Sequence, residues 1–194
     1  MRELSLHVLD IAQNSLAAGA TYVEIEITED RSQDRLTIAI RDNGRGMSQD
    51  LAARASDPFV TTRETRKVGL GLPLFAASAA ACDGGLTISS AEGVGTTVVA
   101  SFRASHIDRA PLGDMGSTIA AILACNPGVR VRYVHRVLGP GGAGGLSGPS
   151  ERRFEFDSED VQSKLGDVPI SNPRVITFIR GMIQQEISAL SGGE

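Results

Sequence analysis

The chain has 194 residues, a net charge of −4 and a hydrophobic fraction of 41%, which are ordinary values for a globular protein. The acidic balance argues against nucleic acid and anionic membranes as partners, and the aromatic fraction of 4% weakens any case for base stacking. The longest apolar stretch, residues 68–82, is too short to span a bilayer, so we expect a cytoplasmic protein without a membrane segment. Cys82 and Cys125 fit no metal-binding spacing and are expected to be buried thiols.

The first part of the chain has one helical pattern followed by two strand patterns. Apolar residues recur at helical spacing over 4–18, and alternating apolar and polar residues predict strands over 21–29 and 35–42. Ser48 is the expected N-cap of a short helix that ends near Ala55. The polar and basic residues that follow, 57–69, are expected to form a loop.

A helix and a hairpin complete this part of the chain. The helix is expected over 70–85, with Pro73 in its first turn, where the missing N–H costs nothing. The hairpin strands are expected over 86–92 and 96–102. Because consecutive strands are joined by short turns, the sequence predicts an α+β fold with a largely antiparallel sheet.

The pattern changes after residue 105, so we divide the chain into residues 1–105 and a C-terminal α/β unit, 106–194. This unit is expected to contain a helix, a β-hairpin with a Gly-rich tip and two further helices, and to bind a partner. Its expected segments are a helix over 114–124, a strand over 129–137, the Gly-rich tip over 138–150, a strand over 152–157, a helix over 158–166 with Ser158 as its cap, and a helix from Pro173 to about Leu190.

The strand over 129–137 carries three arginines, Arg130, Arg132 and Arg136, on one face. These arginines form either a basic surface for an acidic partner or a solvated strand face, and the solvated face is the preferred interpretation.

Two polar side chains on the first helix, Asp10 and Asn14, are one turn apart and therefore lie on one face. The carboxamide oxygen of Asn14 suits Mg²⁺, and a carboxylate one turn earlier can orient or deprotonate a water molecule. An exposed polar helix face predicts the same residues, and this plain interpretation is preferred for the motif on its own.

Two glycine-containing turns have a second interpretation as parts of a binding site. The segment DNGRG at 42–46 reads as a hairpin turn, but Asp42 at a strand end can also accept a hydrogen bond from an adenine amino group. Gly44 and Gly46 would then let the backbone approach the base. The segment EGVGT likewise fits a turn, while its Thr96 could reach a bound base.

A basic loop leads into a glycine-rich helix start within residues 57–74. Gly69 and Gly71 precede a helix whose first N–H groups lack partners inside the helix, an arrangement that binds anions. Arg63, Arg66 and Lys67 lie upstream and could close over phosphate groups. The alternative is a solvated basic loop before an ordinary helix.

The four motifs follow one another in the order helix-Asn, strand-DxGxG, loop-GxGL and turn-GxGT, over about residues 4–103. This order resembles the N, G1, F/G2 and G3 boxes of the Bergerat-fold ATP-binding superfamily, which contains gyrase, Hsp90, histidine kinases and MutL. The segment DPFVTTR is similar to the F box of histidine kinases, and AQNSLAAGA is similar to the N box of MutL. The resemblance implies a two-layer α/β sandwich, with helices over a mixed, mostly antiparallel sheet and ATP under a lid at about 57–69.

The resemblance also implies a role for each matching residue. Asn14 would bind Mg²⁺, Asp42 would hold the adenine amine, and Asp10 would act as a base or orient a water molecule. The other nucleotide-binding positions that it implies are Gly44, Gly46, Phe59, Thr61, Thr62, Arg63, Lys67, Gly69, Leu70, Gly71, Leu72 and Thr96.

The implied function is that of a MgATP-binding protein of the histidine-kinase type, which binds ATP or ADP and phosphorylates or regulates a separate protein partner. MutL-type ATPases have Glu at the position of Asp10 and Asp at that of Ala17, so hydrolysis is less favoured than transfer. Two alternatives stay open: a nucleotide-gated switch without phosphotransfer, and a slow ATPase with Asp10 as base. His7, His106 and His135 are interpreted as structural or surface residues, so a phosphoacceptor would lie on the partner. The sequence leaves the oligomeric state open, a homodimer included.

Overall fold

The structure is a computed structural model that describes residues 3–55, 71–139 and 150–191. The whole predicted lid, 57–69, and most of the Gly-rich tip, 138–150, lie outside the described residues. The same holds for the predicted site residues Phe59, Thr61, Thr62, Arg63, Lys67, Gly69 and Leu70.

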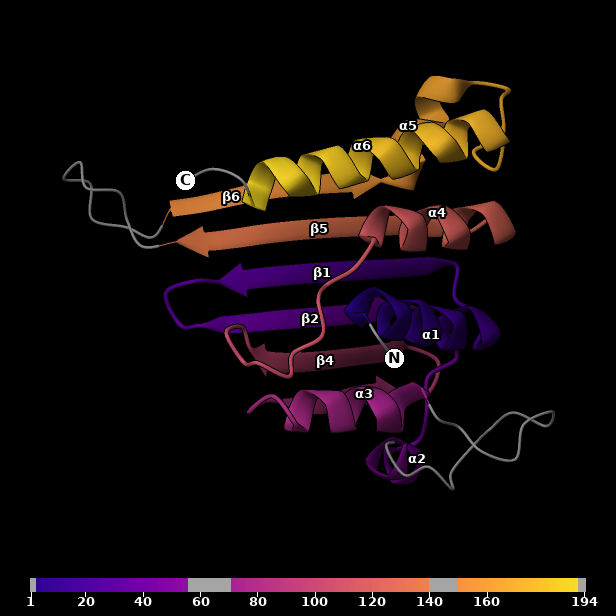
Figure 1. Ribbon diagram of the computed structural model, residues 1–194. Coiled ribbons are helices and arrows are strands. Elements are labelled where there is room, and N and C mark those ends of the chain that lie inside the picture. Colours follow the sequence, from indigo (N-terminus) through magenta and orange to yellow (C-terminus); the bar gives the residue numbers. More distant parts are fainter. Residues whose placement is uncertain (1–2, 56–70, 140–149, 192–194) are drawn as a thin grey trace.

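The described strands form one mixed sheet of six strands: β1 (Tyr22–Asp30), β2 (Arg35–Asp42), β3 (Gly85–Ala91), β4 (Gly95–Arg103), β5 (Arg130–Gly139) and β6 (Ser150–Asp157). Their order across the sheet is β3-β4-β2-β1-β5-β6 (Figure 1). The pair of β1 and β5 is parallel, and every other neighbouring pair is antiparallel. The prediction of an α+β fold with a mixed, mostly antiparallel sheet is therefore confirmed.

Helices cover one face of this sheet. The helices of the described residues are α1 (Leu4–Ala17), α2 (Gln49–Arg54), α3 (Gly71–Ala80), α4 (Met115–Cys125), α5 (Ser158–Leu165) and α6 (Pro173–Ser191). Figure 1 shows α3, α1, α4 and α6 side by side in front of the strands, which gives a two-layer sandwich. None of the described helices is long and apolar enough to cross a membrane.

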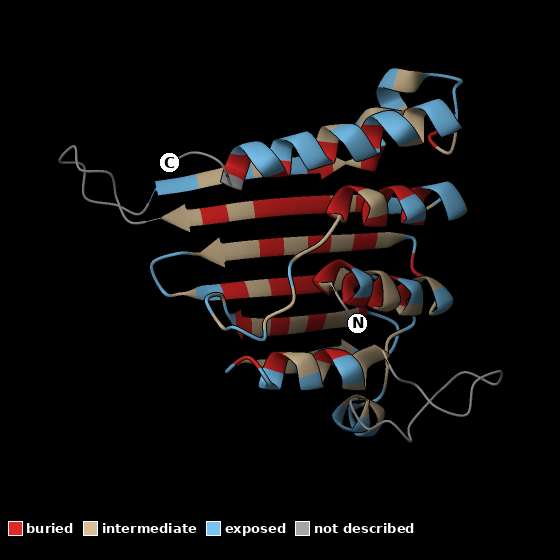
Figure 2. Cartoon of the chain, in the orientation of Figure 1, coloured by how far each residue is buried: buried red, intermediate tan, exposed pale blue. Residues whose placement is uncertain are grey.

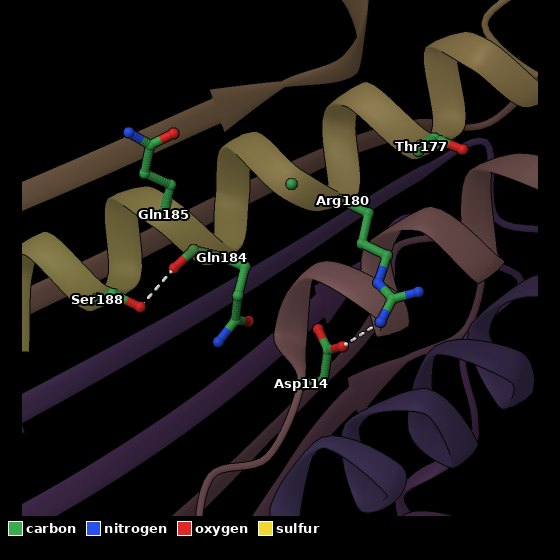
Figure 3. A pocket seen from close by; sticks show the side chains of 7 residues that line it. Asp114, Thr177, Arg180, Gln184, Gln185 and Ser188 are labelled. Atoms are coloured by element: carbon green, nitrogen blue, oxygen red, sulfur yellow. Dashed lines mark hydrogen bonds and ion pairs between the residues drawn. The ribbon is translucent and has the colours of Figure 1, made fainter.

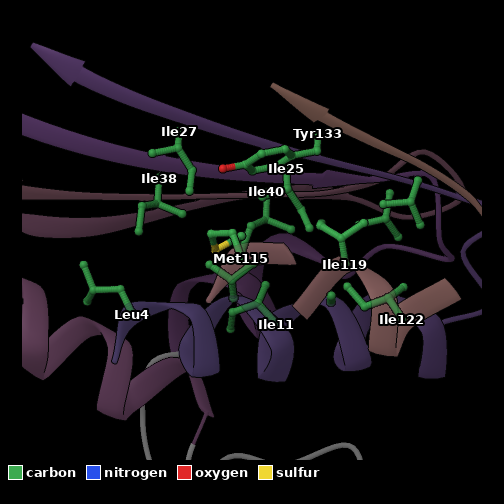
Figure 4. Close-up of a cluster of buried hydrophobic side chains, with 14 of the residues drawn as sticks. Leu4, Ile11, Ile25, Ile27, Ile38, Ile40, Met115, Ile119, Ile122 and Tyr133 are labelled. Atoms are coloured by element: carbon green, nitrogen blue, oxygen red, sulfur yellow. The ribbon is translucent and has the colours of Figure 1, made fainter. Parts of the chain in front are cut away.

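The core lies between these two layers. Ile25 and Ile27 alternate along β1 with Glu24 and Glu26, because successive side chains of a strand point to opposite faces. The same alternation appears as red bands along the strands in Figure 2. Figure 4 shows the isoleucines of β1 and β2 pointing toward side chains of α1 and α4, Met115 among them. The apolar stripes of both helices thus close over the inner face of the sheet.

The C-terminal half extends the sheet of the N-terminal half. β5 follows β1 along its whole length, from Tyr22 opposite Arg130 to Asp30 opposite Leu138. α4 packs against α1, and its apolar side chains belong to the same core cluster as those of β1 and β2. Residues 1–105 and 106–194 therefore share one sheet and one core, and the assignment of partner binding to the second segment stays a prediction.

Three local details differ from the sequence-based predictions. α3 ends at Ala80, before the predicted end: Asp83 has a left-handed φ of +52°, and the Gly84 N–H donates back to the Ala79 carbonyl at 3.0 Å. The N-cap of α5 is Asp157, which accepts a hydrogen bond from the Glu159 N–H at 3.0 Å, and Ser158 is buried instead. Cys82 is buried as expected, but Cys125 at the end of α4 is exposed.

Ion pairs cross the outer face of the sheet, which is the face opposite α1, α3, α4 and α6. Arg132 contacts Glu24 of β1 and Glu155 of β6, both at 2.5 Å. Arg136 pairs with Glu26 at 3.3 Å, and Arg130 pairs with Asp157 at 2.7 Å. The three arginines of β5 are thus matched by carboxylates of their own chain.

A buried polar chain joins β5 to β1 on the inner face. The hydroxyl of Tyr133 and Nδ1 of His135 are 2.8 Å apart, and Nε2 of His135 is 2.8 Å from the Glu29 carboxylate. In the neutral imidazole, Nε2–H donates to Glu29 and Nδ1 accepts from Tyr133, so all three groups are satisfied. Burial raises the pKa of Tyr133, so its hydroxyl keeps its proton.

We expect Glu29→Gln to lower the free energy of unfolding at neutral pH by about 1 kcal/mol, because a neutral acceptor replaces a charged one. The hydrogen bond from His135 lowers the pKa of Glu29 in the folded state. A carboxyl group with a lowered folded-state pKa contributes stability above its unfolded-state pKa and loses it as the pH falls through the folded-state pKa. Urea denaturation at neutral pH and below about pH 4 measures this. The difference between the two proteins should shrink in acid, and an equal difference at both pH values would contradict the assignment.

Candidate functional site

Asp42, at the end of β2, is held by three hydrogen-bond donors from the part of the chain that the structure describes. The Ser15 hydroxyl donates to Oδ2 at 2.6 Å, and the N–H groups of Gly44 and Thr96 donate to Oδ1 at 2.9 and 3.2 Å. A carboxylate offers about four acceptor positions, so the three donors among the described residues leave one position, on Oδ2, for a further donor. Asp42 is therefore fixed in orientation and can accept one further donor.

Three segments of the chain meet around Asp42. Ser15 comes from α1, Gly44 from the turn after β2, and Thr96 from the start of β4. The turn after β2 also bonds to both neighbours, because the Arg45 N–H donates to the Ala18 carbonyl at 3.0 Å and the Arg45 carbonyl accepts from Gly93 at 2.8 Å. The structure thus brings together the predicted residues Asp42, Gly44 and Thr96.

Two glycines make this meeting of backbones sterically feasible. Gly46 has a φ of +67°, and a Cβ there would overlap with the carbonyl of Ala91. Gly95 has a φ of +132°, and a Cβ there would overlap with the carbonyl of Asp42 itself. Both positions therefore require glycine on backbone grounds, and a contact of Gly44 or Gly46 with a base stays a prediction.

Asn43 ties the segment after β2 to the start of β1. This segment is not the predicted hairpin turn, because β2 pairs with β1 and β4 and the chain continues into α2. The side-chain Oδ1 of Asn43 accepts hydrogen bonds from the N–H groups of Thr21 and Tyr22, each at 2.9 Å. Its Nδ2 donates to the hydroxyl of Thr21 at 2.9 Å. The side chain ties the turn after β2 to the start of β1, which leaves the neighbouring Asp42 carboxylate directed toward α1 and β4.

Asp10 and Asn14 lie beside the first residue of α3. A Cβ built on Gly71 would be 3.6 Å from Cβ of Asp10 and 3.7 Å from Nδ2 of Asn14. The first N–H groups of α3, which lack partners inside the helix, therefore begin next to these two side chains. Leu72, also predicted to bind a ligand, packs against the hydrophobic core.

His7 anchors α1 against α3 one turn before Asp10. Its ring stacks on the ring of Phe75 with centroids 4.9 Å apart, and both side chains are buried. Burial lowers the pKa of His7, so the ring is neutral at neutral pH. This contact sets the position of the start of α3 relative to Asp10 and Asn14.

The sequence analysis did not predict two hydroxyl groups of the site, which belong to Ser15 and Ser90. Ser90 accepts a hydrogen bond from the Met47 N–H at 2.9 Å and lies 2.9 Å from the Thr96 hydroxyl. Ser15 follows the buried positions Val8 and Ile11 at helical spacing and is itself buried. A polar residue inside an apolar helix stripe was the signal that could have identified Ser15.

The family described as "Histidine kinase-, DNA gyrase B-, and HSP90-like ATPase" matches residues 1–106. This segment is more than half of the chain and contains all four motifs. The chain belongs to this family. The resemblance to the Bergerat-fold ATP-binding superfamily is thereby confirmed, and the N-terminal part is an ATP-binding domain of the histidine-kinase-like type.

Two bacterial signalling proteins, by their names a sensor protein and a kinase, are similar to this ATPase-family member. The C4-dicarboxylate transport sensor protein DctB of Pseudomonas aeruginosa is 38% identical over 74 residues, which is 38% of this chain and 12% of that protein. Sporulation kinase E of Bacillus subtilis is 39% identical over 64 residues, 33% of this chain and 8% of the kinase. The chain thus matches only a small part of the length of either protein.

A solved structure of the Aquifex aeolicus MutL ATPase domain, complexed with ADP, superposes with a TM-score of 0.45 at 19% identity. The match covers 70% of this chain and 60% of the MutL chain.

Proposed function

We propose that this chain binds MgATP between α1, the end of β2 and the start of α3, and that it phosphorylates or regulates a separate protein. The open acceptor position on the Asp42 carboxylate carries this proposal. Three donors fix that carboxylate, so it is oriented before a ligand arrives. An oriented acceptor at the edge of an ATP-binding domain suits the exocyclic amino group of adenine.

The remaining residues suit the other end of the nucleotide. Asn14 offers a carboxamide oxygen to Mg²⁺, which prefers oxygen ligands and neutralises phosphate charge. The start of α3 lies beside Asn14, which supports a role for its N–H groups in binding the phosphates that the metal would share. Phe59, Thr61, Thr62, Arg63, Lys67, Gly69 and Leu70 are proposed to complete the site.

Two buried histidines support a phosphoacceptor on another protein. His7 is 2% exposed and His135 is 0% exposed, so neither ring can reach a γ-phosphate without local unfolding. In the proposed reaction, a histidine or serine side chain of the partner takes the γ-phosphoryl group, and ADP is the product. The resemblance to sporulation kinase E of Bacillus subtilis supports transfer to a protein.

Incubation with γ-labelled ATP, Mg²⁺ and proteins of the source cells should place the label on a distinct partner. Asn14→Ala should reduce this labelling by about tenfold or more, because it removes a proposed metal ligand. Calorimetry with MgATP should show weaker binding to this variant, while binding of ATP in EDTA should change little. An equal loss of affinity with and without Mg²⁺ would contradict the metal role of Asn14.

The same experiment separates transfer from its alternatives. MgATP binding without any labelled partner would contradict phosphotransfer and favour a nucleotide-gated switch. Asp10, which is shorter than the Glu of MutL-type ATPases, is the observation that favours such a switch over hydrolysis. Steady-state phosphate release that Asp10→Asn abolishes would instead indicate a slow ATPase with Asp10 as base.

A further inference from the structure

The strand β6 forms one edge of the sheet. Among the described residues, no backbone group makes a hydrogen bond to the free side of this strand. The other edge strand, β3, contacts α2. An unpaired edge presents a row of N–H and C=O groups, on which a further strand can be added.

Charges on the outer face alternate from strand to strand up to this edge. Arg41 of β2 pairs with Glu24 and Glu26 of β1, at 2.7 and 2.8 Å. Arg132 of β5 pairs with Glu24 on one side and with Glu155 of β6 on the other. The ladder ends at the edge on Glu155 and on Arg153, which is 2.5 Å from Glu155.

The sequence of β6 is complementary to itself in one antiparallel register. Residues directly opposite one another in such a pair point to the same face, with Cβ atoms about 5 Å apart. A two-fold axis at Phe154 places Arg153 of each copy opposite Glu155 of the other, so both pairs have opposite charges. Glu151 then faces Asp157, whose charge Arg130 of its own chain already balances at 2.7 Å.

Neighbouring registers bring like charges together. An axis at Arg153 sets that residue against its own copy, and an axis at Glu155 does the same for Glu155. An axis at Arg152 opposes two arginines on the inner face. Like charges directly opposite each other are destabilising. Of these registers, only the one centred on Phe154 sets Arg153 of each copy opposite Glu155 of the other.

The helix that packs over β6 is α6, and it carries a row of apolar side chains on the flank that faces away from α4. Arg180 of α6 bonds to Asp114 at the start of α4 at 3.2 Å, which identifies the flank that faces α4 (Figure 3). Phe178, Met182 and Ala189 repeat at intervals of four and seven residues on the opposite flank. Phe178 and Ala189 are exposed, and Met182 is half-buried against the core. Phe178 is 67% exposed, which is unusual for an aromatic side chain without a partner.

We propose that two copies of this chain associate through β6, antiparallel about Phe154, to form one sheet that is continuous across both copies. The charge ladder then extends through Arg153 and Glu155 into the second copy. The row of Phe178, Met182 and Ala189 on each α6 packs beside the axis and supplies the apolar contact that paired edges alone lack. Because the interface uses none of the residues assigned to ATP, this inference is independent of the proposed function.

Sedimentation velocity should show a dimer of the wild-type chain. Arg153→Glu and Glu155→Arg should each give a monomer, because either change sets like charges against each other at both positions. An equimolar mixture of the two variants should again sediment as a dimer. One variant carries Glu at both positions 153 and 155 and the other carries Arg at both, so opposite charges face each other in the mixed dimer. Thr87→Glu, which adds a charge to the opposite edge strand β3, is the matched control and should leave the dimer intact. Circular dichroism checks that each variant is folded.

A wild-type chain that is monomeric at about 100 µM would overturn the proposal, because a specific interface of ordinary size associates well below that concentration. Single variants that stay dimeric, or a mixture that stays monomeric, would also overturn it. If the wild-type chain is monomeric and a different protein is found to add a strand to β6, the edge binds that partner and not a second copy. Asn14→Ala should dimerise like the wild type, so a failure of ATP binding is distinguishable from a failure of this proposal.

Discussion

Asp42→Asn should weaken MgATP binding by about 10- to 150-fold, the cost of one hydrogen bond to a charged group. Asparagine keeps Oδ1 for the N–H groups of Gly44 and Thr96, so the turn after β2 should hold its shape. Its NH₂ group replaces Oδ2 and cannot accept a hydrogen bond from the adenine amino group. Calorimetric titration with MgATP measures the loss.

The nucleotide base provides the internal control for this variant. Guanine carries a carbonyl oxygen where adenine has its amino group, so the ratio of ATP affinity to GTP affinity should fall in Asp42→Asn. Asp34→Asn is the matched protein control, because Asp34 bonds to Ser105 in the turns at the other end of the sheet. Unchanged ATP affinity in Asp42→Asn would remove this residue as the reader of adenine.

Gly95→Ala should lower the free energy of unfolding by about 3 kcal/mol, which corresponds to a fall in Tm of roughly 6–12 °C. The φ of +132° at Gly95 is a conformation that L-residues with a side chain rarely adopt, and the added Cβ would overlap with the Asp42 carbonyl. The turn before β4 must therefore move, and with it the Thr96 N–H that holds the Asp42 carboxylate. ATP affinity should fall together with stability.

Gly85→Ala is the matched control for this effect. Gly85 begins β3, has no unusual φ, and a Cβ there meets nothing within 4 Å. Thermal denaturation should therefore place this variant close to the wild type. Equal losses for the two substitutions would show that backbone geometry at Gly95 is not the cause.

The local elements could be predicted from the sequence because each has its own periodicity. Alternation along β1 and β2 and the helical spacing on α1 depend only on which face of each segment is buried. The ends of the elements depend also on contacts with distant segments. Asp157 and Ser158 are adjacent and both suit an N-cap, and only the hydrogen bond from Val131 to Ser158 decides between them.

The motifs predicted which residues gather at the site, but not how they are held. Asp42, Gly44 and Thr96 are far apart in the chain and meet as the order of motifs implied. The hydroxyl of Ser15 could not be assigned, because its bond to Asp42 depends on the packing of α1 on β2. The parallel pairing of β5 with β1 was equally hidden, since strands more than 100 residues apart leave no local signal of their register.

That parallel pair also sets the order in which the protein can form during synthesis. β1 and β2 leave the ribosome early and can pair at once, and β4 and β3 can follow as a hairpin. β1 must then keep an unpaired edge until β5, more than 100 residues later, has been made. A nascent chain can therefore bring Asp42, Ser15 and Thr96 together while one edge of β1 is still unpaired. Only the later pairing with β5 fills this edge.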